Sequence, residues 1–342
     1  MKILHLPTNP CGQPALSCKA LRLAGHDAKF YCVKAVHPRY QYAYGPDLHQ
    51  RFHGTWGRRF ELIWQMTSFP LRFEVFHYHD AMTLLPDSWR EFDAKLFRQL
   101  GRKVIVEFWG SDVRNPVVES KRNPYYTNSY SDDPGRSQDR LKRWADVTNG
   151  HVIYGDHSFD EILEPHFSNI HYVPQRMDMS FFSPTFPDPS TKKPVLVHAP
   201  SQKAFKGTKF VQEAVERLKA KKLNFEYVEV FGLPQKEAMD VYRRADLIVD
   251  QVCIGSHGVF SVEAMALGKP VVCYILPELV PTYPSGFPII SANPETLENV
   301  LEEWLQSPRN LYTRGVESRA YAERVHSLDV VGRLLSDVYA GL

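Results

Sequence analysis

The sequence predicts an α/β protein with two domains, each built on a parallel sheet flanked by helices. The chain of 342 residues exceeds the usual size of one domain. Short apolar runs alternate with helical patterns almost throughout, which is typical of β-α-β units. Residues 182–194 are rich in proline and polar side chains and follow neither period, so they are expected to link the two domains.

The first domain is expected over residues 1–180. Gly25 and Gly101 follow two helical patterns and favour the left-handed conformation that often ends a helix. The expected strands are Lys2–Leu6, Ala28–Val33, Glu74–Tyr78, Lys103–Phe108, Val152–Tyr154 and Ile170–Val173, and the expected helices are Gln13–Ala24 and Asp87–Leu100.

The second domain is expected over residues 190–326, where the alternation restarts. Its expected strands are Val195–His198, Phe225–Phe231, Leu247–Asp250 and Pro270–Ile275, and its helices are Thr208–Lys221, Gln235–Ala245 and Val259–Leu267. Three helices, around Pro294–Gln306, Leu311–Val325 and Asp329–Tyr339, close the chain. The last of them carries an apolar stripe at helical spacing.

Composition favours a soluble protein and argues against several partners. The 41 basic and 39 acidic residues nearly cancel, whereas a dedicated nucleic-acid binder needs a local excess of lysine and arginine. The amino terminus lacks the pattern of a signal peptide, and no window approaches the length of an apolar membrane span. The five cysteines show no paired spacing, as expected for a cytoplasmic protein without a disulfide or zinc framework.

The most informative stretch runs from Ala245 to Val272. It predicts a strand, a loop with Gly255 and Gly258, a helix and a second strand. Glycines let the backbone approach a ligand closely, and the free N–H groups at a helix start favour an anion such as a diphosphate. Glu263, about one turn into the helix, could accept hydrogen bonds from ribose hydroxyls. The alternative is a tightly packed helix start with a surface glutamate.

A second stretch, His198 to Thr208, follows a strand and opens a helix. Lys203 and Lys206 stand in it, and Lys206 precedes Gly207. By the resemblance given next, both lysines would reach a diphosphate, where two ammonium groups would neutralise the charge that develops on a leaving group. The alternative is that both are solvated lysines at a helix entry.

These two stretches resemble the donor site of retaining nucleotide-sugar glycosyltransferases of family 4. The Ala264-Met265-Ala266-Leu267-Gly268-Lys269-Pro270-Val271 run, with Glu263 before it, matches the motif of that family, as does the Lys206-Gly207 pair. Members usually carry a first glutamate where this chain has Gly255. The resemblance implies the GT-B fold, in which two Rossmann-like domains with parallel sheets face each other across a cleft. In that fold the carboxy-terminal helix, here within residues 327–342, crosses back to the first domain.

The resemblance also implies the site residues. Lys206 and Lys203 would hold the donor diphosphate, and the donor would contact Gly12 on the opposite wall and the residues Ser256, His257, Gly258, Val259 and Glu263. The Trp109-Gly110-Ser111-Asp112 turn resembles a His-Gly-Ser-Asp turn of the family, with tryptophan in place of the histidine near the transferred sugar. Asp112 is therefore a catalytic candidate, and either His77 or His79 could supply the missing polar contact, with His79 the chosen candidate.

The sequence thus predicts a glycosyltransferase that needs no cofactor and no metal and takes a nucleotide diphosphate-sugar as donor. Its acceptor is open: a glycan, a lipid-linked molecule or a small molecule. An epimerase acting on the nucleotide-sugar and a degenerate nucleotide-sugar-binding protein remain alternatives. No metal-ligand spacing and no Asp-x-Asp triplet is present.

The stretch from His53 to Phe73 mixes arginines with aromatic residues. It predicts either a helix that docks on an anionic membrane, placing the protein at the inner membrane surface, or a core helix with two solvated arginines.

Overall fold

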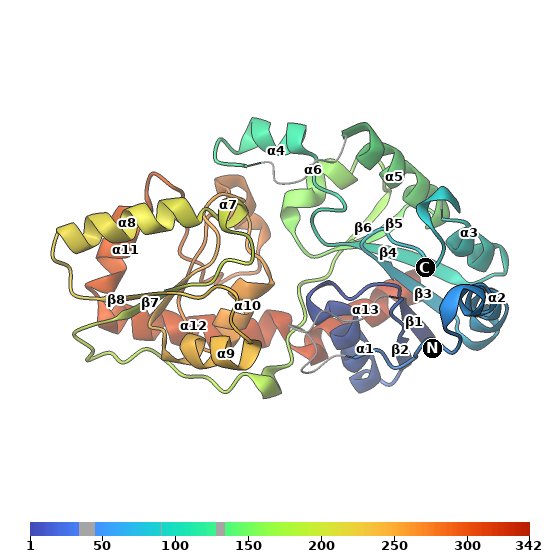
Figure 1. Cartoon of the computed structure of the whole chain (residues 1–342), viewed down its shortest axis with the longest axis horizontal. Coiled ribbons are helices and arrows are strands. Elements are labelled where there is room, and N and C mark those ends of the chain that lie inside the picture. Colours follow the sequence, from blue (N-terminus) through green and yellow to red (C-terminus); the bar gives the residue numbers. More distant parts are fainter. Residues whose placement is uncertain (34–44, 90, 128–133) are drawn as a thin grey trace. The chain divides into compact units, whose positions relative to one another are not determined.

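The computed structural model describes residues 1–33, 45–89, 91–127 and 134–342 (Figure 1). It divides into two compact units, each assembled from separate stretches of the chain. Unit 1 comprises Met1–Asn115, Asp132–Arg176 and Leu328–Leu342, and unit 2 comprises Pro116–Ser131 and Met177–Ser327.

Unit 1 contains a six-stranded sheet in the order β2-β1-β3-β4-β5-β6, and every pair of neighbours is parallel. Its strands are β1 (Lys2–Leu6), β2 (Asp27–Phe30), β3 (Val75–His79), β4 (Lys103–Phe108), β5 (His151–Tyr154) and β6 (Asn169–Tyr172). The strands β1, β3, β4 and β5 are buried on both faces, as expected where helices cover a parallel sheet, whereas the edge strand β6 is partly exposed. The order reverses between β1 and β3, and ligands of doubly wound sheets bind beyond the carboxyl ends of such strands.

The helices of unit 1 include α2, within the stretch His53–Phe73 that was expected to be helical, and α5 and α6, which the sequence analysis did not predict. The α-helices are α1 (Gln13–Leu23), α2 (Gly54–Arg72), α3 (Phe92–Gln99), α5 (Pro134–Val147), α6 (Asp160–Leu163) and α13 (Leu328–Gly341), and the 3-10 turns are η1 (Pro10–Gly12), η3 (Asp87–Trp89) and η4 (His157–Phe159). The single helix expected over Asp87–Leu100 is divided into η3 and α3. Glu91, directly before α3, has a φ of 57°, which no regular helix allows.

The carboxy-terminal helix α13 packs on α1, so the chain returns to unit 1 after leaving it (Figure 1). A side chain at Gly332 of α13 would come within 2.5 Å of the carbonyl oxygen of Ala20. Glycine therefore allows the two helices to approach closely. Val331, Leu335 and Tyr339 are buried in the core below them, and the predicted crossing is confirmed.

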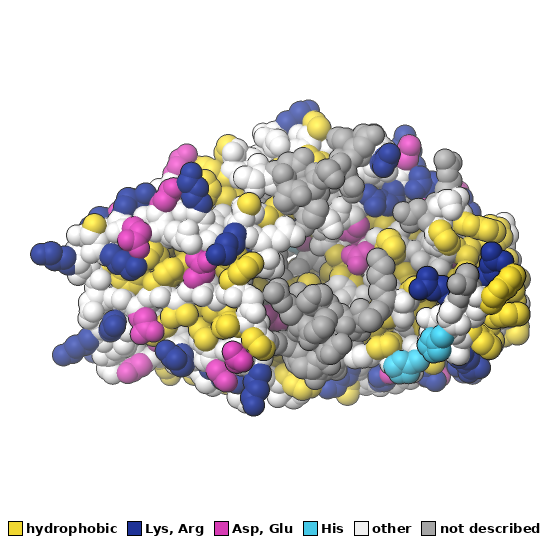
Figure 2. Space-filling model, in the orientation of Figure 1, with side chains coloured by type: hydrophobic (Ala, Val, Ile, Leu, Met, Phe, Trp, Pro, Cys, Tyr) yellow, Lys and Arg dark blue, Asp and Glu magenta, His cyan; other side chains and the backbone are white. Residues whose placement is uncertain are grey.

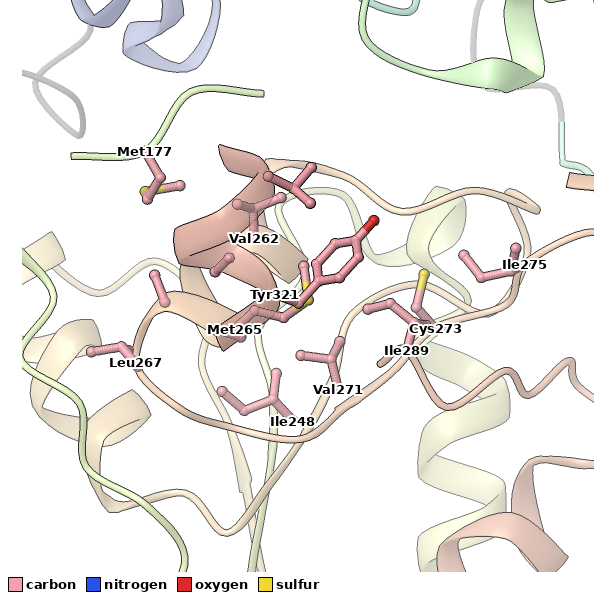
Figure 3. Close-up of a cluster of buried hydrophobic side chains, with 14 of the residues drawn as sticks. Met177, Ile248, Val262, Met265, Leu267, Val271, Cys273, Ile275, Ile289 and Tyr321 are labelled. Atoms are coloured by element: carbon pink, nitrogen blue, oxygen red, sulfur yellow. The ribbon is translucent and has the colours of Figure 1, made fainter. Parts of the chain in front are cut away.

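Unit 2 contains a four-stranded parallel sheet in the order β10-β9-β7-β8. Its strands are β7 (Val195–His198), β8 (Glu226–Glu229), β9 (Leu247–Val249) and β10 (Val271–Val272), and its helices are α4 (Pro116–Arg122), α7 (Lys203–Lys206), α8 (Thr208–Ala220), α9 (Gln235–Arg244), α10 (Val259–Ala266), α11 (Leu297–Leu305) and α12 (Pro308–His326), with turns η5 (Met179–Phe181) and η6 (Pro277–Thr282). Figure 3 shows part of its core, where Val262 and Met265 of α10 gather with Ile248, Val271 and Tyr321.

The stretch 116–131 belongs to unit 2, although residues 1–180 were expected to form one domain. The amide of Asn123 donates to the carbonyl of Cys253 at 2.9 Å, and the ring of Tyr125 packs edge-on against Tyr274. These contacts join sequence positions more than a hundred residues apart, which no local pattern reveals. None of the described helices combines the length and apolarity needed to cross a bilayer.

Candidate active site

The reversal of strand order in unit 2 lies between β7 and β9, so the segments after these two strands define the expected ligand site. Lys206 follows β7 on α7, and Asp250 and Gln251 directly follow β9. The Nζ of Lys206 lies 2.7 Å from Oδ1 of Asp250 and also donates to the side-chain oxygen of Gln251. Residues from both sides of the reversal therefore meet in one charged cluster.

Asp250 is held from a third direction, by α10. Its Oδ2 accepts a hydrogen bond of 2.6 Å from the hydroxyl of Ser261. Burial pushes the pKa of Asp250 upward, but Lys206 and Ser261 outweigh burial, so the pKa lies below its usual value. Asp250 thus stays ionised and fixes the Lys206 ammonium at the carboxyl end of the sheet.

The backbone conformation after Lys206 requires glycine at position 207. Its φ of +77° is left-handed, and a side chain would come within 2.5 Å of Val252 and 2.7 Å of the Cys253 sulfur. The backbone N–H of Val252 donates to the carbonyl of Lys206 at 3.2 Å. Only glycine permits this close packing, which holds Lys206 beside the loop after β9.

The start of α10 faces the same cluster. A side chain at Gly258, the residue before the helix, would lie 3.7 Å from Nζ of Lys206 and 3.8 Å from Oδ2 of Asp250. The first N–H groups of a helix have no partner within it and attract anions. Lys206 and the start of α10 therefore offer positive charge and backbone donors to one small region. The backbone of Gly258 has a φ of −109°, which any residue can adopt.

Glu263 lies one turn into α10 and is partly exposed. Burial raises its pKa to about 7, with a further contribution from the Asp250 carboxylate. Among the described residues, none forms an ion pair or a hydrogen bond with this carboxylate, although most poorly solvated carboxylates in proteins are paired. Such a group favours a ligand that donates hydrogen bonds.

Ser256 and His257 contribute backbone to the loop, because their side chains are turned inward. Ser256 is buried, and its carbonyl accepts from the side-chain amide of Gln251. His257 is buried against the rings of Tyr283 and Phe287, with centroids 5.2 and 5.6 Å away. Val259, the first residue of α10, is partly buried.

Gly255 cannot be replaced by the glutamate that the resemblance would place there. Its φ is +89°, and a side chain would come within 2.7 Å of Leu276 and 3.3 Å of the amide of Asn123. The carbonyl of Gly255 accepts a 2.8 Å hydrogen bond from the N–H of Leu276. The backbone conformation at Gly255 therefore excludes the glutamate that the resembling motif has at this position.

Lys203 lies outside the cluster around Asp250 in this structure. Its Nζ forms a 2.7 Å ion pair with Glu229 and lies 4.9 Å from the ring centroid of Phe231. About half of the Lys203 side chain is exposed. Of the two expected phosphate-binding lysines, the structure brings only Lys206 to Asp250.

In unit 1, the strand order reverses between β1 and β3. The segments after these two strands therefore correspond to the segments after β7 and β9 in unit 2. Gly12 has a φ of +75° and immediately precedes α1, so it allows the sharp entry into that helix. Thr8 donates to Oδ2 of Asp80 at 3.1 Å and thereby connects the two segments. Gly12 therefore lies where a ligand of this unit is expected.

Asp112 organises the turn after β4. Its carboxylate accepts the backbone N–H of Trp109 at 3.0 Å and that of Gly110 at 2.7 Å. The side chain is buried, and burial raises its pKa. We therefore assign Asp112 a positioning role in the turn that presents Trp109.

A buried chain of hydrogen bonds leads inward from Trp109. The indole N–H of Trp109 lies 3.2 Å from Nδ1 of His79, and Nε2 of His79 lies 2.9 Å from Nδ1 of His5. Nε2 of His5 lies 3.2 Å from the hydroxyl of Tyr339, which lies 2.6 Å from Nδ1 of His77. These residues come from β1, β3, α13 and the turn after β4, so the chain of hydrogen bonds joins α13 to the centre of the sheet.

The donors in this chain fix one tautomer for each histidine. An indole N–H only donates, so Nδ1 of His79 must accept and its proton sits on Nε2. Following each bond in turn places the protons of His5 and His77 on Nε2 as well. The Nε2 of His77 then lies 3.2 Å from Oε2 of the Glu107 carboxylate.

Glu107 and Arg176 form a fully buried ion pair at the inner end of this chain. Two hydrogen bonds of 2.7 Å join the guanidinium to the carboxylate. Burial pushes the pKa of Glu107 upward, but Arg176 and His77 outweigh burial and leave the pKa below its ordinary value. Burial lowers the pKa of His5, His77 and His79, which keeps all three neutral.

Among the described residues, His5, His77 and His79 lie close enough together to hold a metal ion. The sequence did not reveal this group, since His5 and His79 are 74 positions apart. The rings of His77 and His79 stack at 4.3 Å, and the nitrogens are engaged in the chain of hydrogen bonds. The arrangement therefore fits hydrogen bonding better than coordination. His79 is fully buried, and its Nδ1 accepts the indole N–H of Trp109.

Solved structures share this arrangement of two parallel sheets. HepE of Anabaena, solved with UDP and glucose, matches with a TM-score of 0.63 at 12% identity, covering 100% of both chains. Sucrose-phosphate synthase of Thermosynechococcus elongatus matches with a TM-score of 0.57 at 13% identity, covering 100% of this chain and 99% of the other. WaaG, a glycosyltransferase of lipopolysaccharide biosynthesis, matches with a TM-score of 0.56 at 14% identity, covering 100% of both chains.

The chain has the GT-B fold. No protein-family model matches its sequence, and no curated protein sequence matches it either. At 12–14% identity, the likeness to solved structures concerns the fold. The ligand and the reaction of this protein therefore have to be inferred from the residues at the carboxyl ends of the two sheets.

Proposed function

We propose that this protein is a glycosyltransferase that moves a sugar from a nucleotide diphosphate-sugar to an acceptor. The observation that carries the proposal is the cluster of Lys206 and Asp250 beside the start of α10, at the reversal of strand order in unit 2. HepE, which has the same fold, was solved with UDP and with UDP-glucose. Two other neighbours of this fold, one from Rickettsia africae and WaaG, are glycosyltransferases by name.

Different residues of unit 2 would bind different parts of the donor. Lys206 and the first N–H groups of α10 would bind the diphosphate, which gains negative charge as the glycosidic bond breaks. Glu263 would accept hydrogen bonds from ribose hydroxyls. Gly258 leaves the space beside Lys206 open, so a phosphate can reach both the ammonium and the backbone.

Lys206 is already neutralised by Asp250 when no donor is bound. This pairing avoids leaving an uncompensated ammonium near the protein interior. The pair also orients the ammonium before the diphosphate arrives, which reduces the entropy lost on binding. Asp250 is thus a positioning residue, and Lys206 is the group that contacts substrate.

Family 4 membership, retention of anomeric configuration and independence of metal are part of the proposal, and they rest on the sequence motif around Glu263. Retention is tested by the anomeric NMR signal of the first-formed product. Metal independence is tested by turnover in excess EDTA, where full inhibition would refute it.

The decisive experiment starts with nucleotide diphosphates alone. At a hundredfold excess over the dissociation constant, one of them should stabilise the protein by about 2.7 kcal/mol, which a thermal scan detects. Nucleotide-sugars are then supplied with and without candidate acceptors, and free nucleotide diphosphate is followed. Release supports transfer or slow hydrolysis. An isomerised donor would identify an epimerase, binding without turnover would identify a binding protein, and no binding would refute the donor site.

A further inference from the structure

Helix α2 exposes a row of large apolar side chains and buries two polar ones, Glu61 and Gln65. Trp56, Phe60, Ile63 and Leu71 are between 58% and 83% exposed. Their spacing of three, four and eight residues places them on one face of the helix. Thr67 lies on the same face and is also exposed. A core helix with two solvated arginines does not account for these four exposed apolar side chains.

The opposite face of α2 carries Glu61, Gln65 and Phe69, each 3% exposed or less. Oε2 of Glu61 accepts the backbone N–H groups of Arg51 and Phe52 at 2.8 and 3.1 Å. Oε1 of Glu61 accepts from the amide of Gln65 at 3.0 Å. A carboxylate that accepts several buried hydrogen bonds is costly to turn outward. Glu61 therefore fixes the rotation of α2 and directs its apolar face to solvent.

The charge of the exposed surface of α2 is entirely positive. Arg58 and Arg59 are exposed, and the guanidinium of Arg59 lies 4.8 Å from the ring centroid of Trp56. Arg72 lies at the other end of the helix, partly exposed. Glu61 is the one acidic residue of α2, and it is buried. Figure 2 shows hydrophobic side chains gathered with basic ones on the face of unit 1 that carries α2 and α3.

We propose that this face of α2 docks on an anionic membrane. Exposed tryptophan and phenylalanine with flanking arginines are typical of helices that lie in the plane of a lipid interface. Arginine binds lipid phosphate, and the aromatic rings enter the boundary between head groups and acyl chains. A protein partner would need acidic residues opposite the arginines and would appear as an oligomer or a complex. The consequence that the acceptor is lipid-linked rests on the proposed glycosyltransferase activity.

Co-sedimentation with vesicles tests the docking without any substrate. The full chain should sediment with phosphatidylcholine vesicles that contain phosphatidylglycerol at low salt, and less with phosphatidylcholine alone. Replacing Trp56, Phe60 and Ile63 together by serine should lower the bound fraction at least about tenfold, because the apolar anchors are lost. The variant should keep its melting temperature, since these side chains are mostly exposed.

Two matched variants separate the contributions. Leu23→Ser removes an exposed apolar side chain of unit 1 that lies on α1, and it should leave vesicle binding unchanged. Arg58→Gln with Arg59→Gln should remove the preference for phosphatidylglycerol and the salt dependence. Wild-type protein that stays in solution with both kinds of vesicle would overturn the proposal. So would a triple-serine variant that binds as well as the wild type, or one that converts a dimer into a monomer.

The same samples distinguish docking from activity. Vesicle binding without stabilisation by any nucleotide diphosphate would keep the docking and refute the proposed function. Nucleotide binding without vesicle binding would keep the proposed function and refute the docking. If both hold, donor turnover should rise on vesicles that carry a polyprenyl-phosphate-linked saccharide and stay at its basal level on plain vesicles.

Discussion

The hydroxyl of Tyr339, on the last helix of the chain, lies 2.6 Å from Nδ1 of His77 in the central strand β3, 262 positions earlier. The same hydroxyl lies 3.2 Å from Nε2 of His5. It therefore donates to one imidazole and accepts from the other, and neither role can be filled by water because all three residues are fully buried. The carboxy terminus thus completes the polar core of the amino-terminal unit.

Tyr339→Phe should destabilise the protein by about 2–4 kcal/mol, because it leaves a buried donor and a buried acceptor without partners. Urea denaturation measures the loss. Tyr312→Phe on α12 is the matched control, since Tyr312 is substantially exposed and its change should have little effect. Equal losses in the two variants would show that the chain of hydrogen bonds contributes nothing specific.

The three buried histidines make stability depend on pH. Their pKa values are lowered in the folded chain, so below about pH 6.5 the unfolded chain binds more protons. Stability should therefore be complete above that pH and fall below it, by up to about 4 kcal/mol per pH unit if three protons are involved. His77→Gln removes one of these titrating groups, so it should lower the slope by about 1.4 kcal/mol per pH unit. A stability that stays constant from pH 7 to pH 5 would contradict the lowered pKa values.

Lys206→Ala should reduce turnover more than it weakens binding of the nucleotide diphosphate, because the charge of the leaving group increases in the transition state. Loss of a charged hydrogen bond in that state corresponds to roughly ten- to a hundredfold in kcat/KM. Lys209→Ala is the matched control, since Lys209 is largely exposed on the neighbouring helix α8. A Lys206 variant with full turnover would refute the site.

Nucleotide binding should strengthen as the pH rises through 7. Burial raises the pKa of Glu263 to about 7, and ribose hydroxyls donate best to the ionised form. The melting-temperature shift caused by the nucleotide should therefore be larger at pH 8 than at pH 6. Glu263→Gln should have a smaller shift that no longer changes with pH, while the free protein stays as stable or becomes more so. A wild-type shift that is independent of pH would exclude this role.

Gly255→Glu, which introduces the glutamate that the resembling motif carries at this position, should destabilise unit 2 by at least about 2 kcal/mol. The left-handed backbone disfavours a side chain, and Leu276 occupies its space. Gly258→Ala is the informative comparison, because its backbone accepts any residue and its contacts are ordinary. Thermal scans should show a loss for the first variant alone, and a stable glutamate variant would contradict the geometry.

Local patterns predicted much of the fold. Alternating apolar runs predicted the strands of both sheets, with differences of one or two residues at most ends, because short apolar segments between glycines rarely form anything else. The Lys206-Gly207 pair and the Glu263 motif led to the segments after β7 and at α10, which meet at the reversal of strand order in unit 2. Lys203 shared the same local signal, but its pairing with Glu229 depends on a strand 26 positions later, which periodicity does not describe.

The sequence by itself determined the two parallel sheets, the glycine positions and the candidate donor residues, since these follow from steric preferences and periodicity within short segments. Only the tertiary structure decided which residues face one another. It brought His5, His77, His79 and Tyr339 into one chain of hydrogen bonds. It also turned Glu61 inward, which exposed Trp56 and Phe60. A buried polar group must find a partner wherever the fold offers one, and that requirement joins residues across any sequence distance.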